Sequence, residues 1–299
     1  MTLSIDLHIH SRNSDGADTV EELVPLIAKA GVDVFALSDH DRTDGWQAAR
    51  ALATEFGLSF IPAIEITTEG RFSDKPRGIH LLAYLPDPNH PELQEVLIAN
   101  QNSRITRMKK FVDKMQPDFP GLTFENVMAG LEEGATVGRP ALAQALVELG
   151  VASKVGDVFD SGLIGRSSKY YVRNESPDVL DAIRIVRDAG GVPVIAHPLS
   201  RTQSDDTRQT HFPEADFEAM VEAGLLGVET SHKEVPAENK LILDAFARKH
   251  NLITTGSSDY HGLSVKENNP LGLYTTEEDQ LKRILELGTG SKPLLQHSI

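Results

Sequence analysis

Residues 6–16 read DLHIHSRNSDG. Two histidines, His8 and His10, stand two positions apart at the end of a short apolar run. Alternate residues of a β-strand project from one face, so both imidazoles point to the same place. A carboxylate, Asp15, follows just beyond the strand. The stretch therefore predicts a first strand whose carboxyl end presents several polar side chains to one site.

Short apolar runs closed by polar residues alternate with amphipathic helices along the chain. This alternation is typical of βα units around a mainly parallel sheet. The 299 residues suffice for one large α/β barrel, which typically takes roughly 250 residues. The seven predicted strands are LSIDLHI (3–9), VDVFALS (32–38), LSFIPAIEI (58–66), RGIHLLAYL (77–85), GVPVIAH (191–197), LLGVETS (225–231) and LITTGSS (252–258).

Two helix starts carry recognisable capping residues. Thr19 and Glu22 form a capping box before an apolar stretch. In the later stretch SPDVLDAIRIVRDAGG, the same reasoning predicts Ser176 as the N-cap, Pro177 in the first turn and Gly190 at the exit.

One segment breaks the alternation of strands and helices. About a hundred residues between Leu85 and Gly191 read almost wholly as helices. We expect residues 101–172 to form an inserted helical subdomain that caps the substrate. Residues 1–100 and 173–299 are then expected to form the barrel.

The composition limits the kinds of site and partner. The chain has no cysteine, so any metal must be held by nitrogen and oxygen atoms. The formal net charge of −15 disfavours a long nucleic-acid groove, because such grooves use Lys and Arg to replace counterions on phosphates. Residues 101–175 hold ten Lys or Arg against nine Asp or Glu, so the positive charge is concentrated there. No apolar stretch approaches the ~18 residues of a membrane span, and a cytoplasmic protein without membrane contact is expected.

Histidines and carboxylates stand at the carboxyl ends of most predicted strands, where ligands gather in parallel sheets and barrels. A single strand histidine is usually a hydrogen-bonded core or surface residue. Burying this whole group of histidines and carboxylates without cations would leave costly unpaired charge. The group also has more side chains than one tetrahedral ion can bind. We therefore expect two or three divalent ions, Mn, Fe or Zn, with Mg as a further option. The side chains are His8, His10, Asp15, Asp39, His40, Asp41, Glu65, His80, His197, Glu229, Asp259 and His261.

The ordered motifs resemble those of the PHP (polymerase and histidinol phosphatase) superfamily. They are DLHIHSRNSDG, SDHD, a Glu after the third strand, a His on the fourth, AHP and SDYHG. Asp15 in the first motif, the helical insertion and GRPALAQALV are similar to the TrpH/YciV-like branch. The resemblance covers nearly the whole chain and implies an α/β fold, a distorted (β/α)7 barrel of the TIM-barrel kind, with a trinuclear metal centre.

The resemblance also implies a role for each ligand. Glu65 would bridge two ions, and Glu229 is left without a ligand role, so we expect it to support the site. The ligands of the first ion would be Glu65 with His8, His10 and Asp259, and those of the second would be Glu65 with His80 and His197. The third ion would be held by Asp15, His40 and His261. The residues expected to act in catalysis are Asp15, His40, Glu65, His197 and His261.

Such a site predicts a hydrolase acting on phosphoric esters. Close divalent cations lower the pKa of a bridging water and absorb charge on a phosphoryl oxygen, so the expected nucleophile is a metal-bridging hydroxide. The resemblance implies removal of the 3' phosphate from nucleoside 3',5'-bisphosphates, hydrolysis of cyclic nucleotides, and 5'-to-3' trimming of short 5'-phosphorylated RNA. Phosphate would be the product.

A phosphate substrate also needs cationic side chains outside the metal ligands. We expect Arg104, Arg107, Arg139 and Lys169 in the insertion to bind substrate, and His232 to stack on a base. The competing interpretation is that helical Arg and Lys residues form an ordinary solvated face.

Other functions stay open at this stage. One is a phosphatase for another small molecule such as histidinol phosphate. Another is an amidohydrolase-type barrel, which also begins with His-x-His, although no strand offers a convincing bridging Lys. A non-catalytic metal-binding interaction module is the alternative outside enzymes. The sequence identifies neither the metals nor the oligomeric state.

Overall fold

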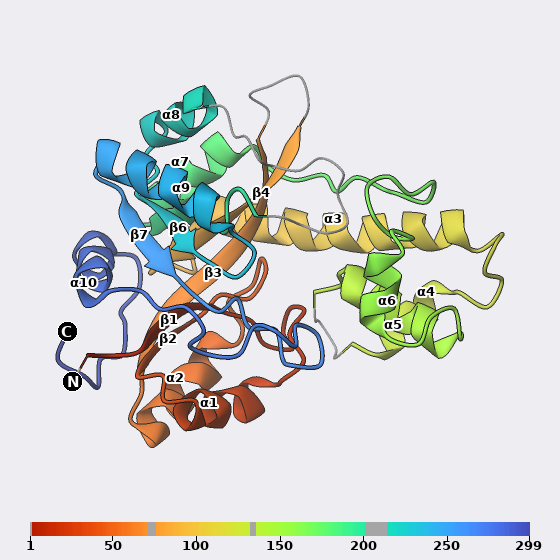
Figure 1. Cartoon of the computed structure of the whole chain (residues 1–299), viewed down its shortest axis with the longest axis horizontal. Coiled ribbons are helices and arrows are strands. Elements are labelled where there is room, and N and C mark those ends of the chain that lie inside the picture. The colour runs from red at the N-terminus through yellow and green to blue at the C-terminus, as the bar shows by residue number, and fades with distance from the viewer. Residues whose placement is uncertain (1, 71–75, 132–135, 201–213) are drawn as a thin grey trace.

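A computed structural model describes residues 2–70, 76–131, 136–200 and 214–299 of the chain. Figure 1 shows a sheet wrapped by helices, which contains both chain ends, and a smaller group of helices to one side. The long helix α3 (Pro91–Met115) runs from the first body into the second.

All seven predicted strands are present and lie in chain order in one sheet. β4 is antiparallel to both its neighbours, and the other neighbouring strands are parallel. β1 and β7 meet through a bridge between Ile9 and Tyr260, which nearly closes the sheet. This confirms the predicted distorted (β/α)7 barrel. The strands are β1 (Ile5–Ile9), β2 (Val34–Leu37), β3 (Ser59–Gly70), β4 (Arg77–Tyr84), β5 (Val192–Ile195), β6 (Gly227–Ser231) and β7 (Ile253–Gly256).

The reversal of β4 explains the distortion of the barrel. Six residues connect β3 to β4, too few for the crossover of about a dozen residues that a parallel connection needs. β4 therefore returns antiparallel, and His80 pairs with Thr67 of β3. His80 lies in the first half of its strand, and the reversal brings it to the edge where the parallel strands end.

The remaining helices pack around the sheet. α1 begins with the predicted capping box, in which Glu22 N donates to Thr19 Oγ1 over 3.2 Å and Thr19 N donates to Glu22 Oε2 over 3.0 Å. Among the described residues, no helix combines the length and the apolar character needed to cross a membrane. The helices that pack around the sheet are α1 (Val20–Lys29), α2 (Trp46–Phe56), α7 (Val179–Asp188), α8 (Glu214–Glu222), α9 (Ala237–Lys249) and α10 (Glu278–Leu287).

The start of α7 differs from the prediction. Its N-cap is Asp178, whose carboxylate accepts a hydrogen bond from Leu180 N over 2.9 Å. Pro177 lies before the helix, and its carbonyl oxygen accepts a hydrogen bond from Glu69 N. Ser176 is therefore not the cap, because the backbone after it is tied to the end of β3 and the carboxylate two residues later caps the helix.

Replacing Asp178 with alanine should destabilise the fold by about 1 kcal/mol, because α7 loses its capping acceptor. Asp178→Asn should cost only a few tenths of a kcal/mol, since asparagine caps about as well. Urea unfolding followed by circular dichroism measures both changes. A loss for Ser176→Ala as large as that for Asp178→Ala would contradict the assignment.

α3 belongs to two hydrophobic clusters. Near its start, Leu93 and Leu97 are buried in a cluster with residues of the sheet and α7. Near its end, Met108, Phe111 and Met115 are buried in a separate cluster with the other helices of the smaller body. The two clusters are joined through one continuous helix.

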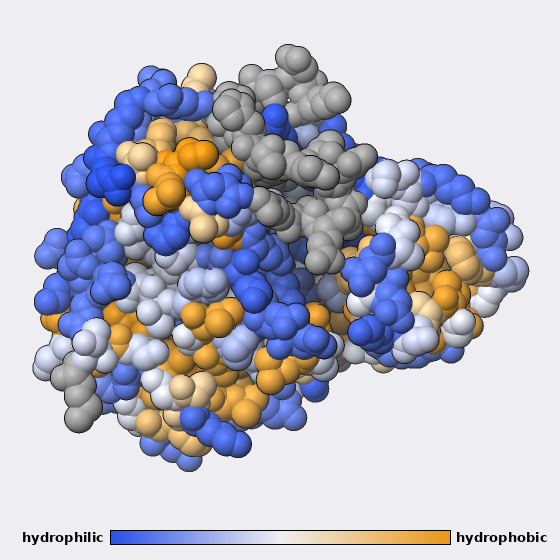
Figure 2. All heavy atoms as spheres, viewed as in Figure 1, coloured by the Kyte–Doolittle hydropathy of each residue, from blue (hydrophilic) through white to orange (hydrophobic). Residues whose placement is uncertain are grey.

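We call residues 108–131 and 136–172 the helical lobe. Figure 2 shows the lobe and the barrel as two rounded bodies with a narrowing between them. The predicted boundary at residue 101 falls inside α3, and the division of the chain into two domains stays a prediction. The segment is helical as predicted, and the helices that follow α3 are α4 (Phe124–Ala129), α5 (Arg139–Glu148) and α6 (Val155–Asp160).

Candidate metal centre

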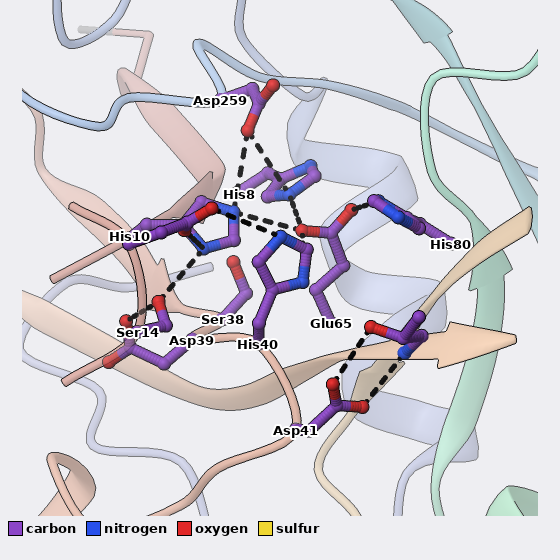
Figure 3. A network of polar contacts seen from close by, with 12 residues as sticks. His8, His10, Ser14, Ser38, Asp39, His40, Asp41, Glu65, His80 and Asp259 are labelled. Carbon is purple, nitrogen blue, oxygen red and sulfur yellow. Dashed lines mark hydrogen bonds and ion pairs between the residues drawn. The ribbon is translucent and has the colours of Figure 1, made fainter. Parts of the chain in front are cut away.

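Glu65 of β3 lies at the centre of the candidate site and is 1% exposed (Figure 3). Its two carboxylate oxygens face different imidazoles, the arrangement that a bridge between two ions requires. Oε2 lies 3.1 Å from His8 Nε2, 3.0 Å from His10 Nε2 and 3.3 Å from His40 Nδ1, and Oε1 lies 2.8 Å from His80 Nδ1 and 3.1 Å from His197 Nε2.

The structure brings all nine predicted ligands into one cluster, which we call the ligand cluster. Within it, three groups of side chains present ligand atoms within 4.8 Å of one another. The first group has the composition predicted for the first ion, the second adds His10 to the set predicted for the third, and the last contains Glu65 and His80 with His40. The groups are His8, His10, Glu65 and Asp259; His10, Asp15, His40 and His261; and His40, Glu65 and His80. Their role as metal ligands stays a prediction.

Several atoms of the ligand cluster are suited to bind something other than protein. His8 Nε2, His10 Nε2, His40 Nδ1 and Asp15 Oδ1 are buried and face oppositely charged atoms of the cluster, but none of them makes a hydrogen bond of normal geometry among the described residues. Buried polar atoms nearly always have a partner, so several such atoms facing one another indicate a common ligand. Imidazole nitrogen and carboxylate oxygen are the donors that Zn, Mn and Fe accept. The side chains therefore fit divalent ions.

Glu229 contacts two of the histidines, His8 and His197, through its carboxylate. Its Oε1 lies 3.2 Å from His8 Nδ1, and its Oε2 accepts a hydrogen bond from His197 N over 2.8 Å. With Nδ1 directed to Glu229, the His8 ring turns Nε2 toward Glu65. Contacts of this kind orient metal-binding imidazoles, which agrees with the supporting role expected for Glu229.

Three residues of the site adopt the left-handed backbone region just after their strands. Asp41, His197 and Asp259 have φ of 56°, 31° and 51°. Residues other than glycine rarely adopt this region, and those that do are common at functional sites, where the surroundings hold them in place. These turns set the direction of side chains at the ends of β2, β5 and β7.

The electrostatics of the ligand cluster favour positive charge. Burial opposes protonation of His8, but Glu65, Glu229 and Asp259 raise its pKa well above the ordinary value. Against the same burial, Asp259 and Glu65 raise the pKa of His10 to about 9. Burial also opposes ionisation of Glu65, yet the surrounding imidazoles hold its pKa well below the ordinary range. A cation would therefore be attracted to this cluster.

A cavity of about 1290 Å³ opens onto the ligand cluster. Within the ligand cluster, His8 and His10 are fully buried and lie behind the cavity wall. Three of the predicted substrate-binding residues line the same cavity: Arg104, Arg107 and Arg139. The seven lining members of the cluster are Asp15, His40, Glu65, His80, His197, Asp259 and His261.

Arg107 shows how crowded the positive charge is in this cavity. Its Nε donates to Val172 O over 2.8 Å, and its guanidinium lies over the rings of Phe111 and Tyr171 at 5.3 and 5.8 Å. Burial, followed by repulsion from Arg139, lowers the pKa of Arg107 to about 10. An anion in the cavity would relieve this repulsion.

Two predicted substrate-binding residues lie outside the lining of this cavity. His232 is 2% exposed, and its Nδ1 accepts from Glu234 N, which leaves Nε2 to donate to Asp259 Oδ2 over 3.2 Å. Lys169 is exposed and pairs with Asp118 over 2.8 Å. Neither residue lines the cavity, so neither is placed to contact a substrate there.

Other cations that line the cavity were missed in the sequence. The Lys266 ammonium pairs with Asp259 Oδ2, and its only sequence signal was its position five residues after His261. Arg166 lies three residues before Lys169 in a loop, where no periodicity tells inward from outward side chains. The remaining lining cations are Lys154, Arg173 and Lys233.

Comparisons with known proteins agree with this geometry. Residues 6–135 match the family model described as the PHP domain. A 5'-3' exoribonuclease from Haemophilus influenzae is 31% identical over 261 residues, which cover 87% of this chain and 91% of that protein. A 3',5'-nucleoside bisphosphate phosphatase from Chromobacterium violaceum is 28% identical, over 86% of this chain and 87% of that protein.

A solved structure from Bifidobacterium adolescentis, described as a candidate metal-dependent phosphoesterase, aligns with a TM-score of 0.86 and 35% identity. The alignment covers 95% of this chain and 96% of that one, so it includes both the barrel and the helical lobe. The chain therefore belongs to the PHP family of metal-dependent phosphoesterases, hydrolases that act on phosphoric esters.

Proposed function

We propose that this hydrolase cleaves phosphoric esters of small nucleotides, and that its main reactions are removal of the 3' phosphate from nucleoside 3',5'-bisphosphates and 5'-to-3' trimming of short 5'-phosphorylated RNA. The observation that carries the proposal is that seven members of the ligand cluster and several arginines line one cavity. A substrate with one phosphate at the cluster and a second anionic group can use both. The names of the two relatives, an exoribonuclease and a bisphosphate phosphatase, support the same substrate class.

The proposal includes an assignment of metal ligands. Glu65 would bridge two ions, and its contacts with five imidazoles support this role. When bound, the ions supply Lewis-acid chemistry, because they polarise a phosphoryl group and lower the pKa of water. The donor set accepts Mn, Fe, Zn or Mg. The first ion would be held by His8, His10, Glu65 and Asp259, the second by Glu65, His80 and His197, and the third by Asp15, His40 and His261.

The other side chains of the cavity would bind and orient the substrate. The guanidinium groups of Arg104, Arg107 and Arg139 offer paired N–H donors that match phosphate oxygens. The rings of Phe159 and Tyr171 also line the cavity and offer faces on which a base can stack. The residues that we propose to act at the reacting phosphate are the lining residues Asp15, His40, Glu65, His197 and His261.

Hydrolysis of a substrate panel tests the proposed function, with phosphate release measured for the monoesters and the nucleotide products separated by chromatography for the cyclic nucleotide and the RNA. The panel contains adenosine 3',5'-bisphosphate, AMP, a cyclic nucleotide, histidinol phosphate and a short 5'-phosphorylated RNA, each with Mn added or metals chelated. We expect metal-dependent turnover led by the bisphosphate or the RNA. Preference for histidinol phosphate would contradict the nucleotide assignment. Absence of turnover with metals shown to be bound would instead favour a structural metal cluster.

Arg107→Gln should raise KM for the bisphosphate about tenfold, because one charge-assisted contact to phosphate is lost. Lys169→Gln is the matched control, since it removes a cation of the helical lobe that does not line the cavity. Its KM should stay within about twofold of the wild type. Steady-state kinetics measure both, and equal effects of the two changes would contradict the assignment of the arginines.

A further inference from the structure

Asp41 follows His40 directly in the chain but faces away from the ligand cluster. Figure 3 shows its carboxylate apart from the imidazoles, with both oxygens in hydrogen bonds. It is fully buried, its backbone is left-handed with φ of 56°, and its N donates to Glu65 O over 3.1 Å. This backbone contact fixes Asp41 beside the residue at the centre of the cluster.

The Asp41 carboxylate joins β3 to α3. It accepts hydrogen bonds from Thr67 N and Oγ1 over 2.9 and 2.8 Å, from Asn100 Nδ2 over 2.7 Å and from Arg104 Nε over 3.1 Å. The Asp41 carbonyl oxygen also accepts from Gln101 Nε2 over 2.8 Å. Thr67 and Glu65 are alternate residues of the same strand. The carboxylate therefore connects the strand that carries Glu65 to the helix that carries Arg104.

Arg104 occupies a defined place because of this carboxylate. Its guanidinium donates to Asp41 through Nε and to Thr67 Oγ1 through Nη2, while Thr67 Oγ1 donates to Asp41 Oδ2. These three residues form a closed ring of hydrogen bonds. Arg104 also lines the cavity. A buried charge whose partners are all fixed holds those partners rigidly, because breaking the pair would leave the charge unpaired.

We propose that Asp41 is a positioning residue that sets the place of Arg104, and of α3 from Asn100 onward, relative to the ligand cluster. The proposal rests on the proposed function, in which Arg104 binds the anionic part of the substrate that lies away from the reacting phosphate. Loss of the Asp41 charge should then weaken binding of substrates that reach Arg104. Hydrolysis of a phosphate ester that occupies only the ligand cluster should be unaffected.

The experiment compares Asp41→Asn with Asp44→Asn. Asp44 lies on the same loop, but it is exposed and pairs with Arg42, so it is a matched control for removing one carboxylate. Each variant is assayed with adenosine 3',5'-bisphosphate and with p-nitrophenyl phosphate. For Asp41→Asn we expect KM for the bisphosphate to rise about tenfold with kcat within about threefold, and KM for the aryl phosphate to stay within about twofold. Asp44→Asn should resemble the wild type with both.

A double variant tests whether Asp41 acts through Arg104. If it does, Asp41→Asn combined with Arg104→Gln should raise KM for the bisphosphate little further than Arg104→Gln alone. Additive increases would overturn the proposal. Equal losses of kcat with both substrates would also overturn it, because they would place the action of Asp41 at the ligand cluster.

Hydrogen exchange separates failure of this proposal from failure of the proposed function. The amides of residues 100–107 should exchange faster in Asp41→Asn than in Asp44→Asn, since the carboxylate that holds this part of α3 is lost. This readout needs no substrate. If the wild-type enzyme does not hydrolyse the bisphosphate, the proposed function is wrong. If hydrogen exchange in Asp41→Asn is unchanged, the positioning role is wrong.

Discussion

Glu65→Gln is expected to lower kcat/KM by about 10³-fold and to reduce the metal bound per chain. The carboxylate touches imidazoles from β1, β4 and the ends of β2 and β5 together. Glutamine has nearly the same shape, so packing is kept. It has no charge, however, and one of its two oxygens becomes an NH₂ donor that cannot bind a cation. Elemental analysis of the purified variant and steady-state kinetics measure the two effects.

The control is Glu55→Gln, which removes an exposed carboxylate on α2. It should leave both metal content and kcat/KM close to those of the wild type. Circular dichroism shows whether Glu65→Gln is folded. A folded Glu65→Gln enzyme that keeps its metal and most of its activity would contradict the central position that we give to this residue.

The ligand cluster could be predicted because strand periodicity is a strong local signal. His8 lies on β1 and His10 directly follows it two residues later, so both point to one face, and Glu65 lies on β3 of the same sheet. Strands that join one sheet must bring such residues to one edge. The reversal of β4 was not predicted. It brings His80 to the same edge, so the predicted ligands still lie together.

The substrate-binding residues were harder to predict because they depend on loops and on tertiary contacts. His232 follows a strand as the ligand histidines do, yet a backbone N–H fixes its Nδ1 and turns it toward Asp259. Lys169 and Arg166 are three residues apart in a loop, and only the tertiary fold directs the arginine into the cavity. Asp41 reads as one more carboxylate at a strand end, and its role depends on partners about sixty residues later in the chain.

Removal of the metals should abolish turnover and also weaken the fold. An ion present at 100 times its Kd stabilises the native state by about 2.7 kcal/mol, because it binds the folded chain and not the unfolded one. Two such ions would therefore account for a fall of roughly 10 °C in the melting temperature on chelation. The apo protein should still fold, since the raised pKa of His8 and His10 allows protons to replace part of the lost positive charge.

Scanning calorimetry and phosphate release before and after dialysis against a chelator check this prediction. Adding Mn, Fe or Zn singly should restore both the melting temperature and the activity, and the most effective ion identifies the preference of the site. In Glu65→Gln the fall on chelation should be smaller, because that variant holds less metal at the start. An enzyme freed of metal that keeps its melting temperature and its turnover would show that the buried imidazoles and carboxylates are satisfied by one another, and the proposed metal centre would have to be abandoned.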